Sequence, residues 1–371
     1  MEMLKEVASN NVKKRYAFID ILEALGILFV VMLHVRVDDC QWLEAGNYLH
    51  LFRYCFRSIL AVCVPLFFFC NGFLLLNKTL DLRNHIIKIL KLMVLTIVWG
   101  GVSVIIYRVK TKNFVSITQA GKYILNYNLA EWTSHLWYMG ALVCLYLFFP
   151  VIKFVYDNKR GYFYYFGIMI FIFTFINKML AYSLSLFLDV FMGKKVVVNT
   201  NLFASFNPVK GIYAYVFIYF FIGGLAFSFR DKIERIDKNK RNIMAILVLT
   251  ISSACFSLMG ICFSKIINTN WDFAWDGYET IFVIINTMAF FVLSLSFTKD
   301  IRIIQEISKN TLGIYFMQYI VIQLTRDFVK QFDFICTLSG NFLYSLIIVL
   351  FCTLISHSLR KIPILCNLVK L

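Results

Sequence analysis

Three ionisable side chains stand inside the first long apolar run of the chain, where their spacing could support chemistry. Asp20, Glu23 and His34 all fall between residues 17 and 37. If this run is a helix, Glu23 and His34 share one face about 16 Å apart, and Asp20 lies near the same stripe. An ionisable group near the centre of a membrane helix costs about 2.5–3.5 kcal/mol, so it usually faces a protein interior or a wet cavity.

Two interpretations of this face are open. In the first, His34 is a neutral imidazole that takes up a proton near physiological pH, and the two carboxyls line a hydrophilic passage. In the second, His34 is an inert, hydrogen-bonded residue at the membrane surface, and Asp20 and Glu23 hold a neighbouring helix.

The elements that must position these groups are membrane helices. The chain has 371 residues, of which 60% are hydrophobic and only 16% charged, too few to coat a soluble domain of this size. Long apolar runs recur from end to end, so we expect an all-α polytopic membrane protein, a bundle of about ten transmembrane helices forming one domain over residues 1–371. The expected spans lie near residues 17–37, 58–76, 86–107, 136–155, 162–181, 212–229, 243–265, 279–298, 311–326 and 341–359.

The distribution of Lys and Arg predicts the orientation. With the amino terminus inside, about 23 basic residues fall on the cytoplasmic side and about 14 outside, so both termini are expected to be cytoplasmic. The connections 108–135 and 182–211 are then external and long enough to cap a cavity. The fifth span has an ill-defined end, and the ninth is so short that we expect it to be broken or partly re-entrant.

Two further features exclude other functions. The net charge of +16 comes from short basic clusters between apolar runs, typical of contact with lipid headgroups and not of nucleic-acid binding. The ten cysteines show no metal or redox spacing, so no metal is expected.

The first span resembles the opening helix of the membrane-bound acyltransferase-3 family, in which an Asp is followed by an Arg and then by a His. Asp20 and His34 match that spacing, but Glu23 occupies the Arg position, and the nearest arginine is Arg15. Four further segments resemble the family in the same order: residues 64–75 with Asn71 before Gly72, residues 135–138 with His135, Trp137 and Tyr138, residues 219–224, and residues 308–315 with Tyr315, followed by Gln318 where a His is frequent.

The resemblance implies an O-acyltransferase of a bacterial plasma membrane. It implies transfer of an acyl group, most simply acetyl, from cytoplasmic acetyl-CoA to a hydroxyl of a cell-surface or lipid-linked glycan. His34 is the candidate base, or a transient carrier of the acyl group, within a catalytic set that also includes Asp20, Glu23 and His135. The candidate substrate-binding residues are Asn71, Trp137, Tyr138, Tyr315 and Gln318.

Each of these residues also has a structural interpretation. Asn71 and Gly72 could serve close helix packing, Trp137 and Tyr138 could be interfacial aromatics, and Tyr315 and Gln318 could form an internal hydrogen-bonded pair. Three basic residues near the inner side, Arg83, Lys88 and Lys91, are candidates for binding the phosphates of coenzyme A. They are equally explained as ordinary cytoplasmic loop charge.

A different class of function also fits the first span. A transporter or flippase for a lipid-linked or polar solute could use Asp20, Glu23 and His34 as a proton relay. The missing inverted repeats and the scarcity of Pro, four in all, argue against it. The acceptor, the acyl chain and the oligomeric state are not encoded in any recognisable pattern.

Overall fold

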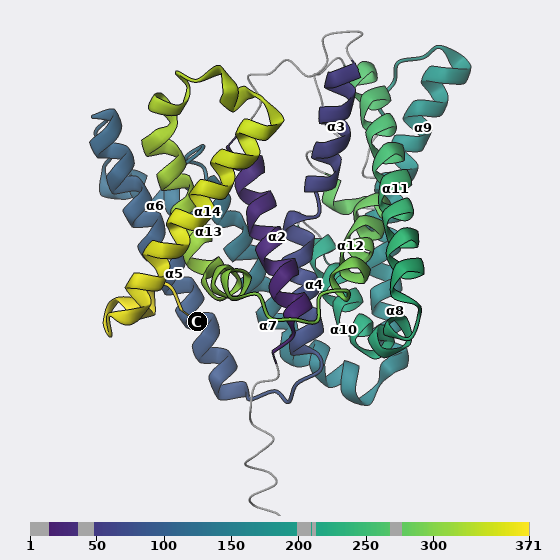
Figure 1. Ribbon diagram of the computed structural model, residues 1–371, viewed down its shortest axis with the longest axis horizontal. Coiled ribbons are helices and arrows are strands. Elements are labelled where there is room, and N and C mark those ends of the chain that lie inside the picture. Colours follow the sequence, from purple (N-terminus) through teal and green to yellow (C-terminus); the bar gives the residue numbers. More distant parts are fainter. Residues whose placement is uncertain (1–14, 36–47, 199–208, 210–212, 268–276, 371) are drawn as a thin grey trace, which may run out of the picture.

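The computed structural model describes residues 15–35, 48–198, 209, 213–267 and 277–370. These residues form an all-α structure (Figure 1). The principal helices are α2 (Ala17–His34), α3 (Tyr48–Leu60), α4 (Cys63–Leu75), α5 (Leu82–Thr111), α6 (Ile117–Leu125), α7 (Trp137–Asn158), α8 (Arg160–Phe171), α9 (Asn177–Met192), α10 (Ala214–Glu234), α11 (Lys238–Ile267), α12 (Ile281–Ser294), α13 (Arg302–Val329) and α14 (Leu338–Lys361).

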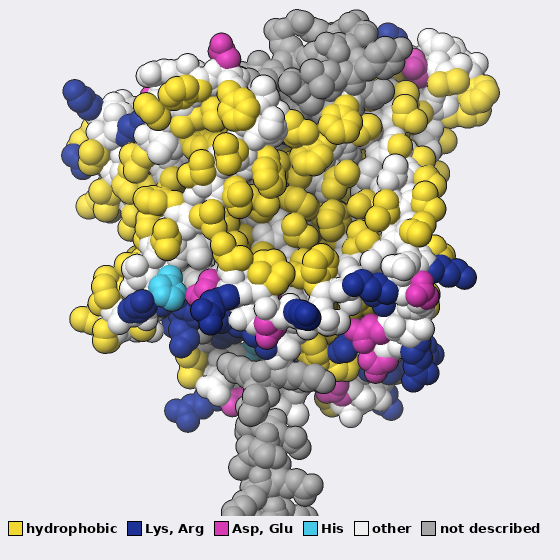
Figure 2. Space-filling view, in the orientation of Figure 1, with side chains coloured by type: hydrophobic (Ala, Val, Ile, Leu, Met, Phe, Trp, Pro, Cys, Tyr) yellow, Lys and Arg dark blue, Asp and Glu magenta, His cyan; other side chains and the backbone are white. Residues whose placement is uncertain are grey.

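The surface confirms a polytopic membrane protein. Within the described residues, seven helices are long and apolar enough to cross a bilayer, and α12 is a shorter apolar helix. Large hydrophobic side chains of α5, α7, α11 and α14 are exposed, which a soluble protein would avoid. Figure 2 shows one face of the molecule with a broad apolar band and most of the Lys, Arg, Asp and Glu side chains of that face below it.

Three details differ from the expected spans. The second span is divided at Ala61 and Val62 into α3 and α4. The fifth continues through a π-helical turn, Ile172–Ile176, and α9 to Met192, so the connection expected from residue 182 starts later. The ninth is not broken: α13 is one helix from Arg302 to Val329, whose polar residues Ser308 and Asn310 are hydrogen-bonded inside the bundle.

The core is built around α2, α4 and α10. A Cβ added to Gly72 on α4 would lie 1.9 Å from the carbonyl oxygen of Phe220, and one added to Gly223 on α10 would lie 2.0 Å from that of Phe69. The two helices therefore touch backbone to backbone, as small residues allow in membranes. The close-packing interpretation of Gly72 is thus the one that the structure supports.

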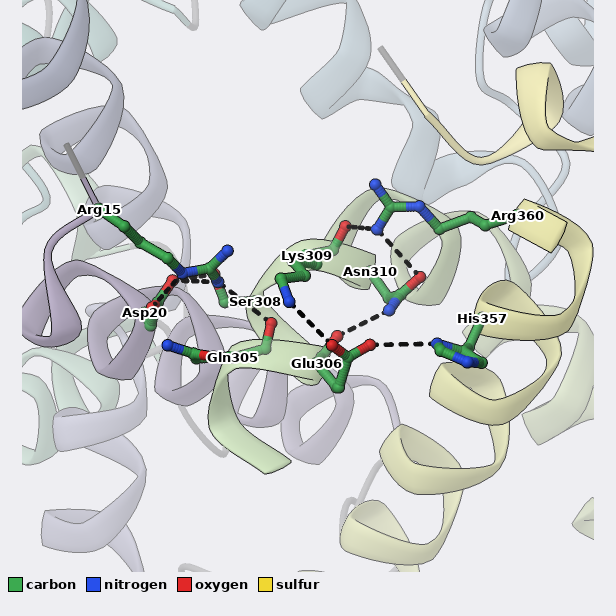
Figure 3. Close-up of polar contacts among 9 residues, drawn as sticks. All are labelled: Arg15, Asp20, Gln305, Glu306, Ser308, Lys309, Asn310, His357 and Arg360. Carbon is green, nitrogen blue, oxygen red and sulfur yellow. Dashed lines mark hydrogen bonds and ion pairs between the residues drawn. The ribbon is translucent and has the colours of Figure 1, made fainter. Parts of the chain in front are cut away.

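Polar contacts fix the amino-terminal end of α13 between α2 and α14 (Figure 3). On the α14 side, Nδ1 of His357 lies 3.1 Å from Oε2 of Glu306, and Nη1 of Arg360 donates to the carbonyl oxygen of Lys309 at 2.8 Å. On the α2 side, Arg15 donates to the carbonyl oxygen of Gln305 at 3.2 Å. These contacts fix the position of α13 along its axis, and therefore the position of its more carboxy-terminal residues in the bundle.

Candidate active site

A cavity of about 470 Å³ lies at the His34 end of α2. It brings together residues from the first, second, fourth, fifth, sixth, eighth and ninth expected spans. Its lining is Val30, Leu33, His34, Cys63, Val64, Phe67, His135, Trp137, Tyr138, Lys178, Tyr215, Tyr278, Glu279 and Tyr315. Five residues selected from the sequence are among them: His34, His135, Trp137, Tyr138 and Tyr315.

The hydrogen bond to Gln318 defines the tautomer of His34. The side-chain amide nitrogen of Gln318 donates to the carbonyl oxygen of Tyr315 at 3.4 Å, which turns the amide oxygen toward His34. That oxygen, Oε1, lies 3.2 Å from Nδ1 of His34. An amide oxygen only accepts, so with the amide in this orientation the bond forms with the Nδ1–H tautomer of His34, in which Nε2 has the lone pair. A neutral imidazole held in this tautomer is equipped to remove a proton from a hydroxyl.

The two ring nitrogens of His135 are buried without a hydrogen bond to any described residue. The side chain is 3% exposed. An unsatisfied buried polar atom costs about 1–3 kcal/mol, so native structures rarely keep one without a functional reason. The ring borders the cavity, where a substrate hydroxyl or carbonyl oxygen could supply the missing partner.

Tyr319 holds the two imidazoles in one arrangement. Its ring centroid lies 4.4 Å from that of His34 and 4.6 Å from that of His135, stacked on the latter at 25°. The two imidazole centroids are 6.5 Å apart. Tyr315 adds a hydrogen bond from its hydroxyl to the carbonyl oxygen of His135. The pair of rings is therefore preorganised at one wall of the cavity.

Asn71 lies deeper, outside the cavity lining, in a chain of hydrogen bonds. Its amide oxygen accepts from the hydroxyl of Tyr146 at 2.7 Å, and that hydroxyl accepts from Nζ of Lys88 at 3.3 Å. The ammonium also lies 4.9 Å from the centre of the Tyr146 ring. This series of hydrogen bonds places the ammonium of Lys88, on α5, against the interior of the bundle.

The other basic candidates do not join Lys88. Nζ of Lys91 donates to Oδ1 of Asn367 at 3.3 Å, and Arg83 is exposed near the start of α5. His85 lies in the same basic cluster of the sequence and was assigned no chemistry; it is buried, and its Nε2 lies 2.7 Å from the carbonyl oxygen of Tyr146. Of the three candidate phosphate-binding residues, Lys88 is the one that contacts the core.

Asp20 and Glu23 meet at one hydroxyl of α13. Oγ of Ser308 lies 2.8 Å from Oδ1 of Asp20 and 2.7 Å from Oε2 of Glu23. A hydroxyl has one proton to donate, so it cannot donate to two carboxyls at once. Arg15 donates to both oxygens of Asp20 at 2.7 Å. Through Ser308 the two acids connect α2 to α13.

Sequence reasoning missed five lining or supporting residues. Lys178 and Glu279 form an ion pair of 3.3 Å at the cavity, and their charges inside expected spans were the available signal. Tyr319 follows Tyr315 by one turn on the same helix face, a repeat that could have been noticed. Tyr215 and Tyr278 carried no signal, since tyrosine occurs throughout this sequence.

The cavity presents several kinds of polar group. They are two imidazoles, phenol hydroxyls, the indole of Trp137, the thiol of Cys63 and one ion pair. Within the described ranges, no group of three or more His, Cys, Asp or Glu side chains is placed to hold a metal ion.

The fold and the cavity together define a polytopic membrane protein with a histidine-lined internal site. Residues 16–360 match the acyltransferase domain of the acyltransferase 3 family. The match spans nearly the whole chain, so the protein belongs to this family and is a membrane acyltransferase, as the resemblance of its first span predicted. No curated protein and no solved structure matches the chain.

Proposed function

We propose that this acyltransferase moves an acetyl group from cytoplasmic acetyl-CoA to a hydroxyl of a cell-surface or lipid-linked glycan. The observation that carries the proposal is the pair of imidazoles at the cavity: Nδ1 of His34 is bonded to Gln318, and neither ring nitrogen of the neighbouring His135 has a hydrogen bond within the described residues. The family membership supplies the acyl donor class in general terms. The acetyl group and the glycan acceptor are the parts proposed here.

The chemistry assigns a role to each imidazole. Nε2 of His34 takes the proton of the acceptor hydroxyl as its oxygen attacks the thioester carbonyl. His135, with one N–H available, donates a hydrogen bond to the oxyanion that forms. Collapse of the tetrahedral adduct breaks the carbon–sulfur bond, and His34 returns the proton to the departing thiolate. The products are the acyl ester and free coenzyme A.

The proposal also includes the arrangement in the membrane. Each of the ten expected spans falls on helical residues, the second on α3 and α4 and the fifth on α8 and α9. Seven candidate membrane spans are long and apolar enough to cross a bilayer within the described residues. The start of α2 and the last described residues lie on the same, lower side of the bundle (Figure 1), which supports two cytoplasmic termini. The membrane is the bacterial plasma membrane in this proposal, with lipids as the surrounding partner.

The donor site belongs on the cytoplasmic side, near α5. Lys88 reaches the bundle interior through Tyr146, so its ammonium is the group best placed to bind a phosphate of the donor. Lys88→Gln should raise the KM for acetyl-CoA about tenfold, the loss of about 1.4 kcal/mol of a charge-assisted contact, while the exposed Lys122→Gln should not. Equal KM values in the two variants would remove Lys88 from the donor site.

A direct test uses the purified protein in nanodiscs with radiolabelled acetyl-CoA and envelope glycans from the cells that carry it. Wild-type protein should release coenzyme A and label the glycan. His34→Ala should lower transfer by about 10²–10⁴-fold, the usual contribution of a general base. Asp157→Asn, which breaks an ion pair with Lys153 outside the cavity lining, serves as the control. Undiminished transfer by His34→Ala would exclude His34, and solute flux without label transfer would favour a transporter.

A further inference from the structure

A second group of side chains lines the cavity beside the imidazoles and has no role in the mechanism above. It consists of the ion pair Lys178–Glu279 and the aromatic residues Trp137, Tyr215 and Tyr278. We refer to these five residues as the ring subsite. They come from α7, α9, α10 and the turn before α12, so only the folded bundle brings them together.

The ion pair is presented to the cavity and only partly shielded. Nζ of Lys178 lies 3.3 Å from Oε2 of Glu279, and the two side chains are 18% and 25% exposed. Charged groups inside a membrane bundle are expensive and mark functional positions more often than structural ones. A hydrophobic pair would fill the same space at lower cost.

Lys178 and Glu279 both lie at or next to irregular backbone segments. Lys178 follows the π-helical turn Ile172–Ile176 by two residues, and such turns are frequent at functional sites because they redirect the side chains that follow. On the other side, the hydroxyl of Tyr219 donates to the carbonyl oxygen of Tyr278 at 2.7 Å. Thr280 binds the carbonyl oxygen of Gly277 at 2.7 Å, so the turn that presents Glu279 is held at two points.

The aromatic residues form an adjoining wall. The ring of Tyr278 lies 5.6 Å from that of Tyr215 and 6.3 Å from that of Trp137, at interplanar angles of 34° and 33°. Trp137 is stacked in turn on Tyr213 at 6.2 Å. Such faces carry negative potential and attract the weakly positive C–H face of a sugar ring.

The pair and the wall fit one class of ligand. A sugar hydroxyl is both a donor and an acceptor, whereas an ammonium only donates and a carboxylate only accepts. Two neighbouring hydroxyls of one ring can therefore satisfy Lys178 and Glu279 together. An anionic group such as a phosphate would meet Lys178 but be repelled by Glu279.

We infer that the ring subsite binds a neutral pyranose ring of the acceptor, with its C–H face on Tyr278 and Trp137 and two adjacent hydroxyls on the ion pair. The inference rests on the proposed function, because it places the hydroxyl to be acylated beside His34. It goes further by assigning the acceptor contacts to five residues and by specifying an uncharged ring.

The test separates acceptor binding from the chemical step. Coenzyme A release from acetyl-CoA is measured with hydroxylamine as a small nucleophile that needs no subsite, and label transfer to envelope glycans is measured in parallel. Lys178→Met, Glu279→Gln and Tyr278→Leu should each lower glycan transfer at least about tenfold, the loss of one good contact. Hydroxylamine-dependent release should stay within about twofold of wild type.

Two further variants exclude a structural role. The double variant Lys178→Met/Glu279→Gln removes the ion pair without leaving an unpaired charge. If the pair is purely structural, glycan transfer should recover in the double variant. If the pair binds the acceptor, glycan transfer should stay low. Tyr278→Phe keeps the aromatic face and should retain most activity. Asp157→Asn, which breaks the 2.6 Å Lys153–Asp157 pair away from the cavity, is the matched control.

The outcomes are distinct. If the subsite variants label the glycan as well as wild type does, the ring subsite is wrong and the proposed function stands. The same holds if glycan labelling and hydroxylamine-dependent coenzyme A release fall in parallel. Wild-type protein that neither releases coenzyme A with hydroxylamine nor labels a glycan would overturn the proposed function, and the subsite with it.

Discussion

His34 and Gln318 are 284 positions apart in the chain, yet Nδ1 of one lies 3.2 Å from Oε1 of the other. The contact joins the end of the first span to the middle of α13. Its importance is chemical as well as structural, because it selects the tautomer in which Nε2 of His34 can act as a base. Gln318 touches no substrate in this arrangement and is a positioning residue.

Removal of this acceptor should slow transfer without unfolding the protein. In Gln318→Leu the imidazole of His34 loses the partner of its Nδ1–H, so the base-competent orientation is less populated. We expect kcat to fall at least about tenfold, a part of the 10²–10⁴-fold that a general base contributes, with little change in the KM for acetyl-CoA. Gln323→Leu, on the same helix but in contact with Glu131, is the control. An unchanged kcat for Gln318→Leu would show that this hydrogen bond does not orient the base.

The shared hydroxyl of Ser308 leads to a prediction about charge at position 23. If Glu23 carries the proton, Glu23→Gln replaces an O–H donor by an N–H donor and should change the free energy of unfolding by less than about 0.5 kcal/mol. Asp20→Asn should cost about 1–3 kcal/mol, since it removes the carboxylate that Arg15 binds at both oxygens. Thermal unfolding in nanodiscs measures both. Equal destabilisation by the two substitutions would mean that Glu23 is ionised.

The backbone contact between α4 and α10 should tolerate no side chain. In Gly223→Ala the new Cβ would lie 2.0 Å from the carbonyl oxygen of Phe69, so the helices must separate. We expect a loss of about 1–3 kcal/mol or more, seen as a lower unfolding temperature. The matched control is Gly101→Ala on α5, where a Cβ meets nothing within 4 Å. If both variants unfold at the same temperature, the close approach is wrong.

The anchorage of α13 on α14 should weaken in acid. Hydrogen bonds, first from Lys309 and also from His357, hold the pKa of the Glu306 carboxyl below its ordinary value of 4.5. A depressed folded-state pKa adds stability above the unfolded pKa, and this contribution is lost as the pH falls through the folded value. The stability advantage of wild type over Glu306→Gln should therefore be constant near neutral pH and shrink below about pH 4.5. An advantage that grows in acid would contradict this sign. The effect is small because the group is partly exposed.

Much of the architecture follows from composition and spacing. Apolar runs long enough to cross a bilayer have no stable alternative to a helix, because backbone groups in lipid must pair within their own segment. This is why every expected span falls on helical residues, even where hydropathy is diluted, as in α13. The ends of the spans were less predictable, because the bilayer argument does not specify where a helix stops outside the membrane. For example, α9 extends to Met192.

The helices, the acids of the first span and the candidate imidazoles could all be predicted from residue types and spacing. Which of them share a site could not, because that depends on the rotation and depth of each helix. Long-range contacts fix both, such as Gly72 against Phe220 and Ser308 against Glu23. His34 and His135 lie on one cavity, whereas Asp20 and Glu23 secure α13 instead. The ion pair between Lys178 and Glu279 depends on a π-helical turn and a short loop. The periodicity of the sequence predicts neither of these two backbone features.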